Sequence, residues 1–176
     1  MYFGNFRKIG YSLDKKYFKS VTDLMSRVKI RDGILDNITL YDKYDVKSGE
    51  TPENIAFKHF GNPDLHWVIL LTNNIQDRYY DWPMSESDFE LFIKDKYSNP
   101  DGIHHYEITQ SSGKQTGNGP DDYTHKLEVN STTSGAQSVS NREYESRLQD
   151  NKRIIKLLNP TVLQSFISEF NDLIGR

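Results

Sequence analysis

Apolar side chains recur every three or four residues in several segments, and most of these segments begin at a residue that can cap a helix. The first follows Thr51-Pro52, a typical N-cap with proline in the first helical turn, and ends at Gly61. Asn62-Pro63 repeats this start for a helix over about 63–73. The same kind of start predicts three later helices: 86–97 after Ser85, 141–151 after Ser140, and one from Pro160 after Asn159.

Short runs in which apolar and polar residues alternate predict strands between these helices. The first run is 41–46, and another lies at 153–158. Two weaker strands, at 103–109 and 123–129, flank a polar stretch over 110–122 that is typical of a long hairpin loop.

The density of apolar residues falls sharply after residue 97. Residues 51–97 contain 20 apolar residues in 47, whereas 99–153 contain 10 in 55, too few for a core of their own. We expect 22–38 to be a short helix or an extended arm, and the small, polar residues 130–140 to be a linker. These patterns predict an α+β fold in four parts: an N-terminal arm (1–40), a compact domain with the helix that follows it (41–97), a β-hairpin with a long polar loop (98–139), and a C-terminal strand with helices (140–176).

Two predicted helices present more apolar surface than the chain is expected to cover. The helix at 63–73 is apolar on nearly all sides. The last helix has an apolar stripe with no obvious partner within the chain, formed by Leu163, Phe166, Ile167, Phe170 and Ile174. The chain is 35% apolar, whereas soluble domains reach roughly 45–50% on a similar count. We therefore expect another protein chain to cover part of this surface.

Charge and composition exclude several classes of function. The chain has 22 basic and 25 acidic residues, which argues against a protein whose main role is to bind nucleic acid. It has no cysteine, which excludes disulfides, thiolate zinc sites and thiol catalysis. The longest apolar run, 67–71, is far shorter than the ~20 residues that span a bilayer, and the first residues lack a signal peptide's apolar core. We expect a soluble protein of a reducing compartment, without a membrane partner.

The residues that could support catalysis or metal binding do not form a complete pattern. Gly113-Lys114 lacks the first glycine and the Ser/Thr of a phosphate-binding loop. His105-Tyr106-Glu107 matches half of a zinc-deaminase pattern whose thiolate ligands are absent. Adjacent strand residues face opposite sides, so at most one of His104 and His105 could join His125 in a metal site, and an exposed polar strand is the simpler interpretation. We predict no catalytic residue, cofactor, metal site or small-molecule substrate.

Aromatic residues remain as candidates for a protein interface, because they bury a large area at low entropic cost. Alternatively, Trp67 and the aromatic turn at 79–82 form part of the small core. With the stripe of the last helix, the candidate interface residues are Trp67, Tyr79, Tyr80, Trp82, Leu163, Phe166 and Phe170.

Residues 44–73 contain a recognisable pattern: Tyr44-x-Val46-x-x-Gly49-x-Thr51-x-x-x-Ile55-Ala56, then Gly61 and Trp67-x-Ile69-x-x-x-Asn73. This pattern resembles the LysM module, and the usual second strand of that module is replaced by 74–83. The resemblance implies a small βααβ unit. Because LysM modules usually bind glycans that contain N-acetylglucosamine, it also implies peptidoglycan binding as an alternative function.

A wider set of motifs extends over nearly the whole chain: Val21-Thr22-Asp23-Leu24, then 49–53, 65–71, Tyr79-Tyr80-Asp81-Trp82-Pro83, and 141–145 through 153–156. In combination and order they resemble the baseplate wedge protein 53 family of T4-type contractile-tailed phages. This resemblance implies a structural virion protein of the tail baseplate, assembled in the host cytoplasm and present in several copies around the tail axis. It implies clamping of wedge proteins and linkage of neighbouring wedges, with no catalysis and no cofactor. A lytic enzyme is a third hypothesis, but the chain lacks the pair of an acid and a nucleophile that such an enzyme would use.

Overall fold

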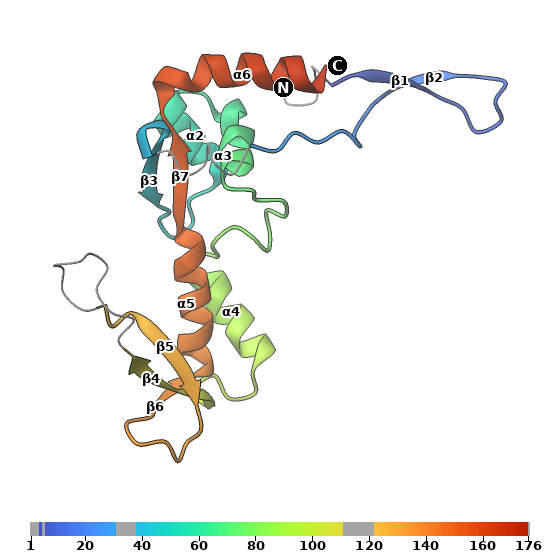
Figure 1. Cartoon of the computed structure of the whole chain (residues 1–176). Coiled ribbons are helices and arrows are strands. Elements are labelled where there is room, and N and C mark those ends of the chain that lie inside the picture. Colours follow the sequence, from blue (N-terminus) through green and yellow to red (C-terminus); the bar gives the residue numbers. More distant parts are fainter. Residues whose placement is uncertain (1–3, 5, 31–37, 111–121, 176) are drawn as a thin grey trace. The chain divides into compact units, whose positions relative to one another are not determined.

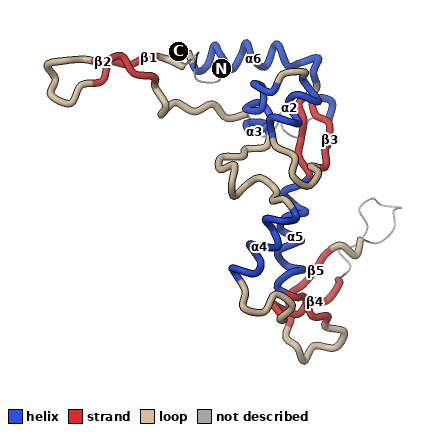
Figure 2. The backbone as a smooth tube through the Cα atoms, turned by 180° about the vertical axis from the view of Figure 1, so that it is seen from behind, coloured by secondary structure: helices blue, strands red, loops and turns tan. Residues whose placement is uncertain are grey.

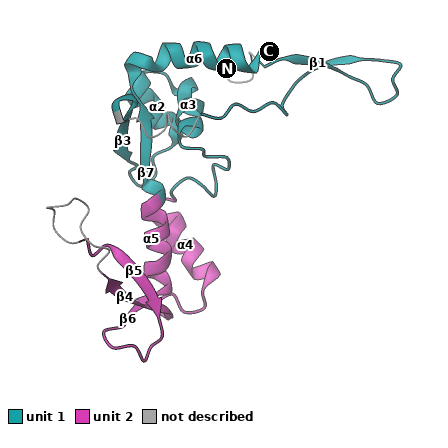
Figure 3. Cartoon of the chain, viewed as in Figure 1, with its two compact units in different colours: residues 1–83, 152–176 teal, residues 84–151 magenta. Residues whose placement is uncertain are grey.

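The computed structural model describes residues 4, 6–30, 38–110 and 122–175, which form both helices and strands, so the predicted α+β class is confirmed (Figure 1). The chain divides into two compact units (Figure 3): unit 1 comprises Met1–Pro83 and Lys152–Arg176, and unit 2 comprises Met84–Asn151. The chain therefore leaves unit 1 once and returns to it. No helix within the described ranges is both long and apolar enough to cross a membrane.

Unit 1 is organised around two strands that are distant in sequence. β3 (Tyr41–Asp45) follows the short 3₁₀ helix η2 (Ile38–Leu40) and pairs antiparallel with β7 (Ile154–Leu158). Three helical segments follow β3 along the chain: α2 (Pro52–Phe60), the 3₁₀ helix η3 (Pro63–Leu65) and α3 (His66–Thr72). The second strand of this β-α-α-β order thus comes from β7 and not from residues 74–83.

The core of unit 1 lies between these strands and helices. Its buried members are Val46, Ile55, Ala56, Ile69, Trp82, Ile155 and Leu157. Asn73, at the end of α3, binds the free edge of β7: its Nδ2 donates to the carbonyl oxygen of Lys156 at 2.8 Å, and its Oδ1 accepts from the backbone N–H of Lys156 at 2.8 Å. One side chain therefore satisfies both backbone polar groups of Lys156, as a third strand would.

The predicted helix starts are confirmed by their capping bonds. Thr51 Oγ1 accepts from the backbone N–H of Asn54 at 3.3 Å, and Gly61 ends α2 with a φ of 74°. Ser85 caps α4 (Glu86–Lys96), Ser140 caps α5 (Asn141–Arg153), and Asn159 caps α6 (Pro160–Ile174). Local hydrogen bonds from these side chains thus mark where the helices begin.

The apolar stripe of α6 has a partner inside the chain, contrary to the expectation from sequence. The Trp67 ring on α3 lies 4.5 Å from the Phe170 ring and 6.2 Å from the Phe166 ring, measured between centroids. Phe6 packs against Phe170 and Ile174. The sequence did not reveal this contact because α3 and α6 are brought together only when β7, which leads into α6, pairs with β3.

Ahead of these elements, unit 1 has a two-stranded hairpin that the sequence did not predict (Figure 2). β1 (Lys8–Tyr11) pairs antiparallel with β2 (Lys19–Thr22). Asp23 holds the base of the hairpin: its backbone N–H donates to the carbonyl of Arg7 at 2.8 Å, and its carboxylate pairs with the guanidinium of Arg7 at 3.1 Å. Residues 23–30 contain no helix, so the extended alternative holds for the described part of 22–38, and 31–37 lie outside the described residues.

Unit 2 combines a three-stranded antiparallel sheet with α4 and the larger part of α5. The strand order is β5 (His125–Val129), β4 (Ile103–Gln110), β6 (Gln137–Ser140). The linker predicted at 130–140 is wrong in its last four residues, because β6 pairs with β4 there. Most of the predicted hairpin loop, 111–121, lies outside the described residues.

The two units divide the chain differently from the four predicted parts. The sequence grouped the helix predicted at 86–97 with the segment before it, whereas α4 belongs to unit 2. The predicted C-terminal part is split, since most of α5 belongs to unit 2 while β7 and α6 belong to unit 1. Apolar density shows which segments are compact, but it does not show which segments pair.

We predict that Trp67→Ala lowers the free energy of unfolding of unit 1 by about 2–4 kcal/mol, because it removes the half-buried ring between α3 and α6. Both tryptophans of the chain lie in unit 1, so the fluorescence of the remaining Trp82 during urea unfolding reports on this unit. Phe57→Ala, at an exposed position, should change stability by less than about 0.5 kcal/mol. Equal urea midpoints for Trp67→Ala and the unmodified chain would contradict the packing of α6 on α3.

Candidate interaction surface

Two adjacent tyrosines in unit 1 are the most exposed of the predicted interface residues. Tyr79 is 84% exposed and Tyr80 is 72% exposed. Tyrosine is enriched at protein interfaces because its rigid ring buries a large area while its hydroxyl forms a hydrogen bond. This pair is therefore the strongest candidate in the predicted set.

Two aspartates hold the turn that presents these tyrosines. Asp77 Oδ1 accepts from the backbone N–H of Tyr79 at 2.8 Å, and Asp81 Oδ2 accepts from those of Gln76 and Asp77 at 3.0 Å each. The backbone N–H of Asp81 also donates to the carbonyl of Asp77 at 2.8 Å. The turn is thus closed by its own hydrogen bonds, so binding through the tyrosines would require little further ordering of the backbone.

Charged side chains strengthen this turn. The backbone N–H groups of Asp77 and Gln76 hold the pKa of Asp81 below its usual value, and nearby Lys152 lowers it further. Lys152 Nζ also donates to the carbonyl oxygen of Tyr80 at 2.5 Å. Arg78 pairs with Glu53 of α2 at 2.8 Å. Because Asp81 is ionised at neutral pH, the bonds that shape the turn persist there.

The other predicted interface residues pack inside unit 1. Trp82 is 7% exposed, and its Nε1 donates to the carbonyl oxygen of Glu50 at 2.9 Å. Phe170 is 3% exposed. Trp67, Leu163 and Phe166 are partly buried around α3 and α6. In this fold these five side chains form the core or its edge, so the interface hypothesis narrows to Tyr79 and Tyr80.

The hairpin is a second exposed surface, and the sequence analysis missed it. Large apolar side chains are exposed in the hairpin (Tyr11, Leu13, Tyr17 and Phe18) and directly after it (Leu24 and Met25). The alternation of Lys8-Ile9-Gly10-Tyr11 is a strand signal that could have revealed β1, but four residues are too few to distinguish a strand from irregular chain.

The histidines considered as metal ligands are not brought together as a set. His125 lies opposite Gln110 on β4, whereas His105 lies near the other end of that strand, opposite Val139. The pairing register of β4 with β6 shifts between Ile103 and His105. The rings of His104 and His105 meet edge to face, with 2.9 Å between their Nδ1 atoms, so the expectation of opposite faces is wrong here. Across the described ranges, no three His, Cys, Asp or Glu side chains are grouped to hold a metal ion. Gly113-Lys114 lies outside them.

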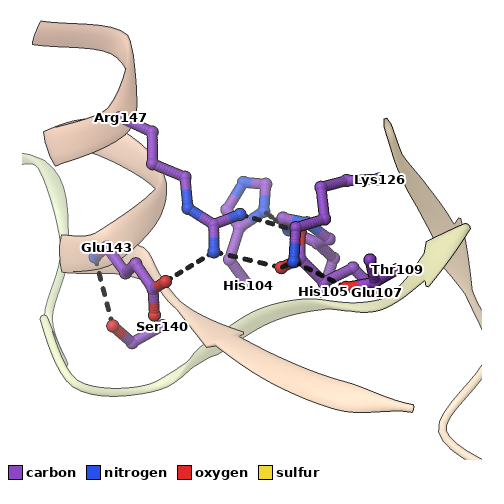
Figure 4. A network of polar contacts seen from close by, with 8 residues as sticks. All are labelled: His104, His105, Glu107, Thr109, Lys126, Ser140, Glu143 and Arg147. Carbon is purple, nitrogen blue, oxygen red and sulfur yellow. Dashed lines mark hydrogen bonds and ion pairs between the residues drawn. The ribbon is translucent and has the colours of Figure 1, made fainter. Parts of the chain in front are cut away.

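Near these histidines, Glu107 on β4 is the centre of a polar network in unit 2 (Figure 4). Glu107 is buried, and both of its carboxylate oxygens accept from Arg147 of α5, at 2.7 and 3.0 Å. Lys126 of β5 lies 3.4 Å from the same carboxylate, and Arg147 also contacts Glu143. The network thus joins the sheet to α5 and leaves the buried carboxylate fully paired, which indicates a structural role.

Glu107 and Glu145, the two carboxylates that are buried in the described part of unit 2, are both held in the ionised form. Hydrogen bonds from Arg147 lower the pKa of Glu107 against the opposing effect of burial, and Lys126 lowers it further. Burial alone would raise the pKa of Glu145, but hydrogen bonds from Lys96 and Tyr97 outweigh it and keep that pKa below its usual value. These two groups tie α5 to β4 and to α4.

We predict that unit 2 loses stability as the pH falls below about 4.3, the ordinary pKa of a glutamate. A carboxylate whose pKa is lower in the folded state stabilises that state fully above the unfolded value, and this stabilisation disappears as the pH falls through the folded value. Hydrogen exchange of unit 2 amides, corrected for intrinsic rates at each pH, measures this loss.

The variant Glu107→Gln provides the control for this pH dependence. It should lower the stability of unit 2 at neutral pH by about 1–3 kcal/mol, and it should weaken the response to acid. An unchanged acid response in Glu107→Gln/Glu145→Gln would show that other groups cause it.

Comparison with known proteins places this chain among phage proteins. A family model described as base plate wedge protein 53 matches residues 1–116. Baseplate wedge protein gp53 of Enterobacteria phage T4 is 40% identical over 60 residues. That alignment covers 34% of this chain and 30% of the T4 protein, so the match spans less than a third of its curated relative. Because the family model spans more than half of the 176 residues, this chain belongs to the base plate wedge protein 53 family.

Proposed function

We propose that this chain is a structural component of a phage tail baseplate, where it holds wedge proteins to one another and links neighbouring wedges. Family membership and the similarity to a T4 baseplate wedge protein support a structural role in the baseplate. In this proposal the chain resides in the virion, is assembled in the host cytoplasm, and is present in several copies around the tail axis. It catalyses no reaction and has no cofactor, nucleic acid, membrane or small-molecule partner.

The observation that carries the proposal is the pair of tyrosines on a closed turn. Tyr79 and Tyr80 expose most of their surface, and Asp77 and Asp81 fix the backbone beneath them. Neighbouring tyrosine rings held on an ordered turn are of the residue type and rigidity that anchor protein interfaces, which supports a partner surface that covers them. A partner wedge protein with an apolar pocket is the occupant that fits this geometry.

A glycan-binding module is the second candidate, because β3, α2, α3 and β7 have the β-α-α-β order expected of a LysM unit. In this alternative the chain binds peptidoglycan and need not join a wedge. Retention of the pure chain on chitin or peptidoglycan beads, with no binding to wedge proteins, would favour it over the structural role.

We predict that Tyr79→Ser/Tyr80→Ser weakens the binding of this chain to isolated wedges that lack it by at least about tenfold, because truncation of aromatic anchors commonly costs 2 kcal/mol or more. Co-sedimentation of the chain with wedge complexes over a range of chain concentrations gives the affinity. The urea midpoint of the variant should match that of the unmodified chain, since neither ring is buried.

Tyr123→Ser is the matched control, because Tyr123 is an exposed tyrosine of unit 2 outside the proposed surface. It should bind wedges as the unmodified chain does. Normal binding by the double variant would remove the tyrosine turn from the proposed interface. Failure of the unmodified chain to bind any wedge complex would overturn the proposed function itself.

A further inference from the structure

Positive and negative charges are concentrated in different parts of this chain, although its net charge is small. Residues 6–30, the hairpin arm, contain seven basic and two acidic residues, a net charge of +5. Unit 2 contains six basic and twelve acidic residues, a net charge of −6, within a chain whose total is only −3. One molecule therefore contains a strongly basic segment and a strongly acidic unit.

The loop of the hairpin arm combines this positive charge with exposed apolar side chains. Leu13 is 90% exposed, Tyr17 is 78% exposed and Phe18 is 70% exposed. Lys15 and Lys16 lie beside them and are exposed as well, and the described residues give neither lysine an acidic partner. An apolar surface bordered by unpaired cations is typical of a segment that is covered when it meets an acidic surface.

The base of the hairpin arm, by contrast, is well anchored. Phe6 packs on α6 through Phe170 and Ile174, and Asp23 accepts a hydrogen bond from Ser26 Oγ at 2.8 Å in addition to its pairing with Arg7. β1 and β2 pair only with each other among the described strands, so both of their outer edges are open. An ordered base with an uncovered loop favours contact with a separate molecule.

We propose that the hairpin arm of one copy of this chain docks on unit 2 of a second copy, head to tail. The net charges of +5 and −6 are opposite and nearly equal, so the chain itself supplies a complementary surface. Unit 2 also exposes apolar side chains that could meet the arm, among them Leu91, Ile103 and Leu127. A head-to-tail contact uses different surfaces on the two copies, so repeated contacts close into a ring or extend as a chain.

This inference deepens the proposed function, on which it rests, because a contact between copies on neighbouring wedges would itself link those wedges. It assigns the hairpin arm to contacts between copies and leaves the tyrosine turn for contacts with other wedge proteins. The two surfaces can therefore be tested separately.

The test uses an arm-silent variant with four substitutions in the β1–β2 loop: Lys15→Gln, Lys16→Gln, Tyr17→Ser and Phe18→Ser. These positions lie outside β1 and β2, so strand pairing is retained. Sedimentation velocity of the pure unmodified chain should show self-association that weakens as salt is raised, because exposed charges are screened. The arm-silent variant should self-associate at least about tenfold more weakly.

The decisive measurement mixes the two proteins. The arm-silent variant keeps its unit 2, so it should still bind the arm of the unmodified chain, and its unit 2 amides should gain hydrogen-exchange protection in the mixture. A control variant with Lys43→Gln, Lys47→Gln and Phe57→Ser, all exposed positions of unit 1 outside the arm, should self-associate normally.

Three results would overturn the inference: an unmodified chain that remains monomeric up to its solubility limit, an arm-silent variant that self-associates normally, or protection in the mixture that appears only in the hairpin arm. None of them bears on the tyrosine turn. An arm-silent variant that joins single wedges but does not self-associate would support both proposals, whereas loss of wedge binding by Tyr79→Ser/Tyr80→Ser concerns the proposed function alone.

Discussion

The antiparallel pairing of β3 with β7 is the constraint on which the rest of unit 1 depends. Arg153, the last residue of α5 and the one directly before β7, pairs with Asp45 at the end of β3, 108 residues earlier in the chain. Closing so long a loop costs only slightly more entropy than closing a short one, because the cost rises with the logarithm of loop length. Once β7 is in place, Asn73 completes its free edge and α6 is brought onto Trp67. Residues 84–151 then form an insertion between α3 and β7.

Sequence patterns predicted the elements of this fold well wherever the cause is local. Thr51, Ser85 and Asn159 each cap the helix that they were predicted to begin, because the bond from a cap to the following N–H groups involves only neighbouring residues. The pairing of β3 with β7 could not be predicted in the same way, since no periodicity records which distant strand lies alongside. The strand β6 was missed for the same reason: Gln137–Ser140 has little β propensity of its own and is ordered by its neighbour β4.

The candidate interface shows what residue type can and cannot reveal. Trp82 and Tyr80 stand two positions apart in one aromatic turn, yet Trp82 is buried with its N–H bonded to Glu50 while Tyr80 is open to water. Residue type predicts that both rings bury a large area when they are covered, and only the surrounding fold decides whether that cover comes from within the chain. The apolar stripe of α6 is covered from within the chain, because the pairing of β7 with β3 brings α6 onto α3.

Unit 2 shows how a segment poor in apolar residues can still be ordered. Its helices and sheet are joined around two buried carboxylates: Glu107 pairs with Arg147 and Lys126, and Glu145 pairs with Lys96 and Tyr97. Compared with well-packed apolar side chains such pairs add little net stability, because removing their charges from water offsets most of the attraction, although the loss of one partner is costly. We infer that they favour one arrangement, since an arrangement that separates a buried carboxylate from its partner leaves that charge unpaired. Unit 2 therefore gains specificity more than stability from these two groups. Both ends of this insertion continue into unit 1, whose apolar core holds the chain segments that flank it.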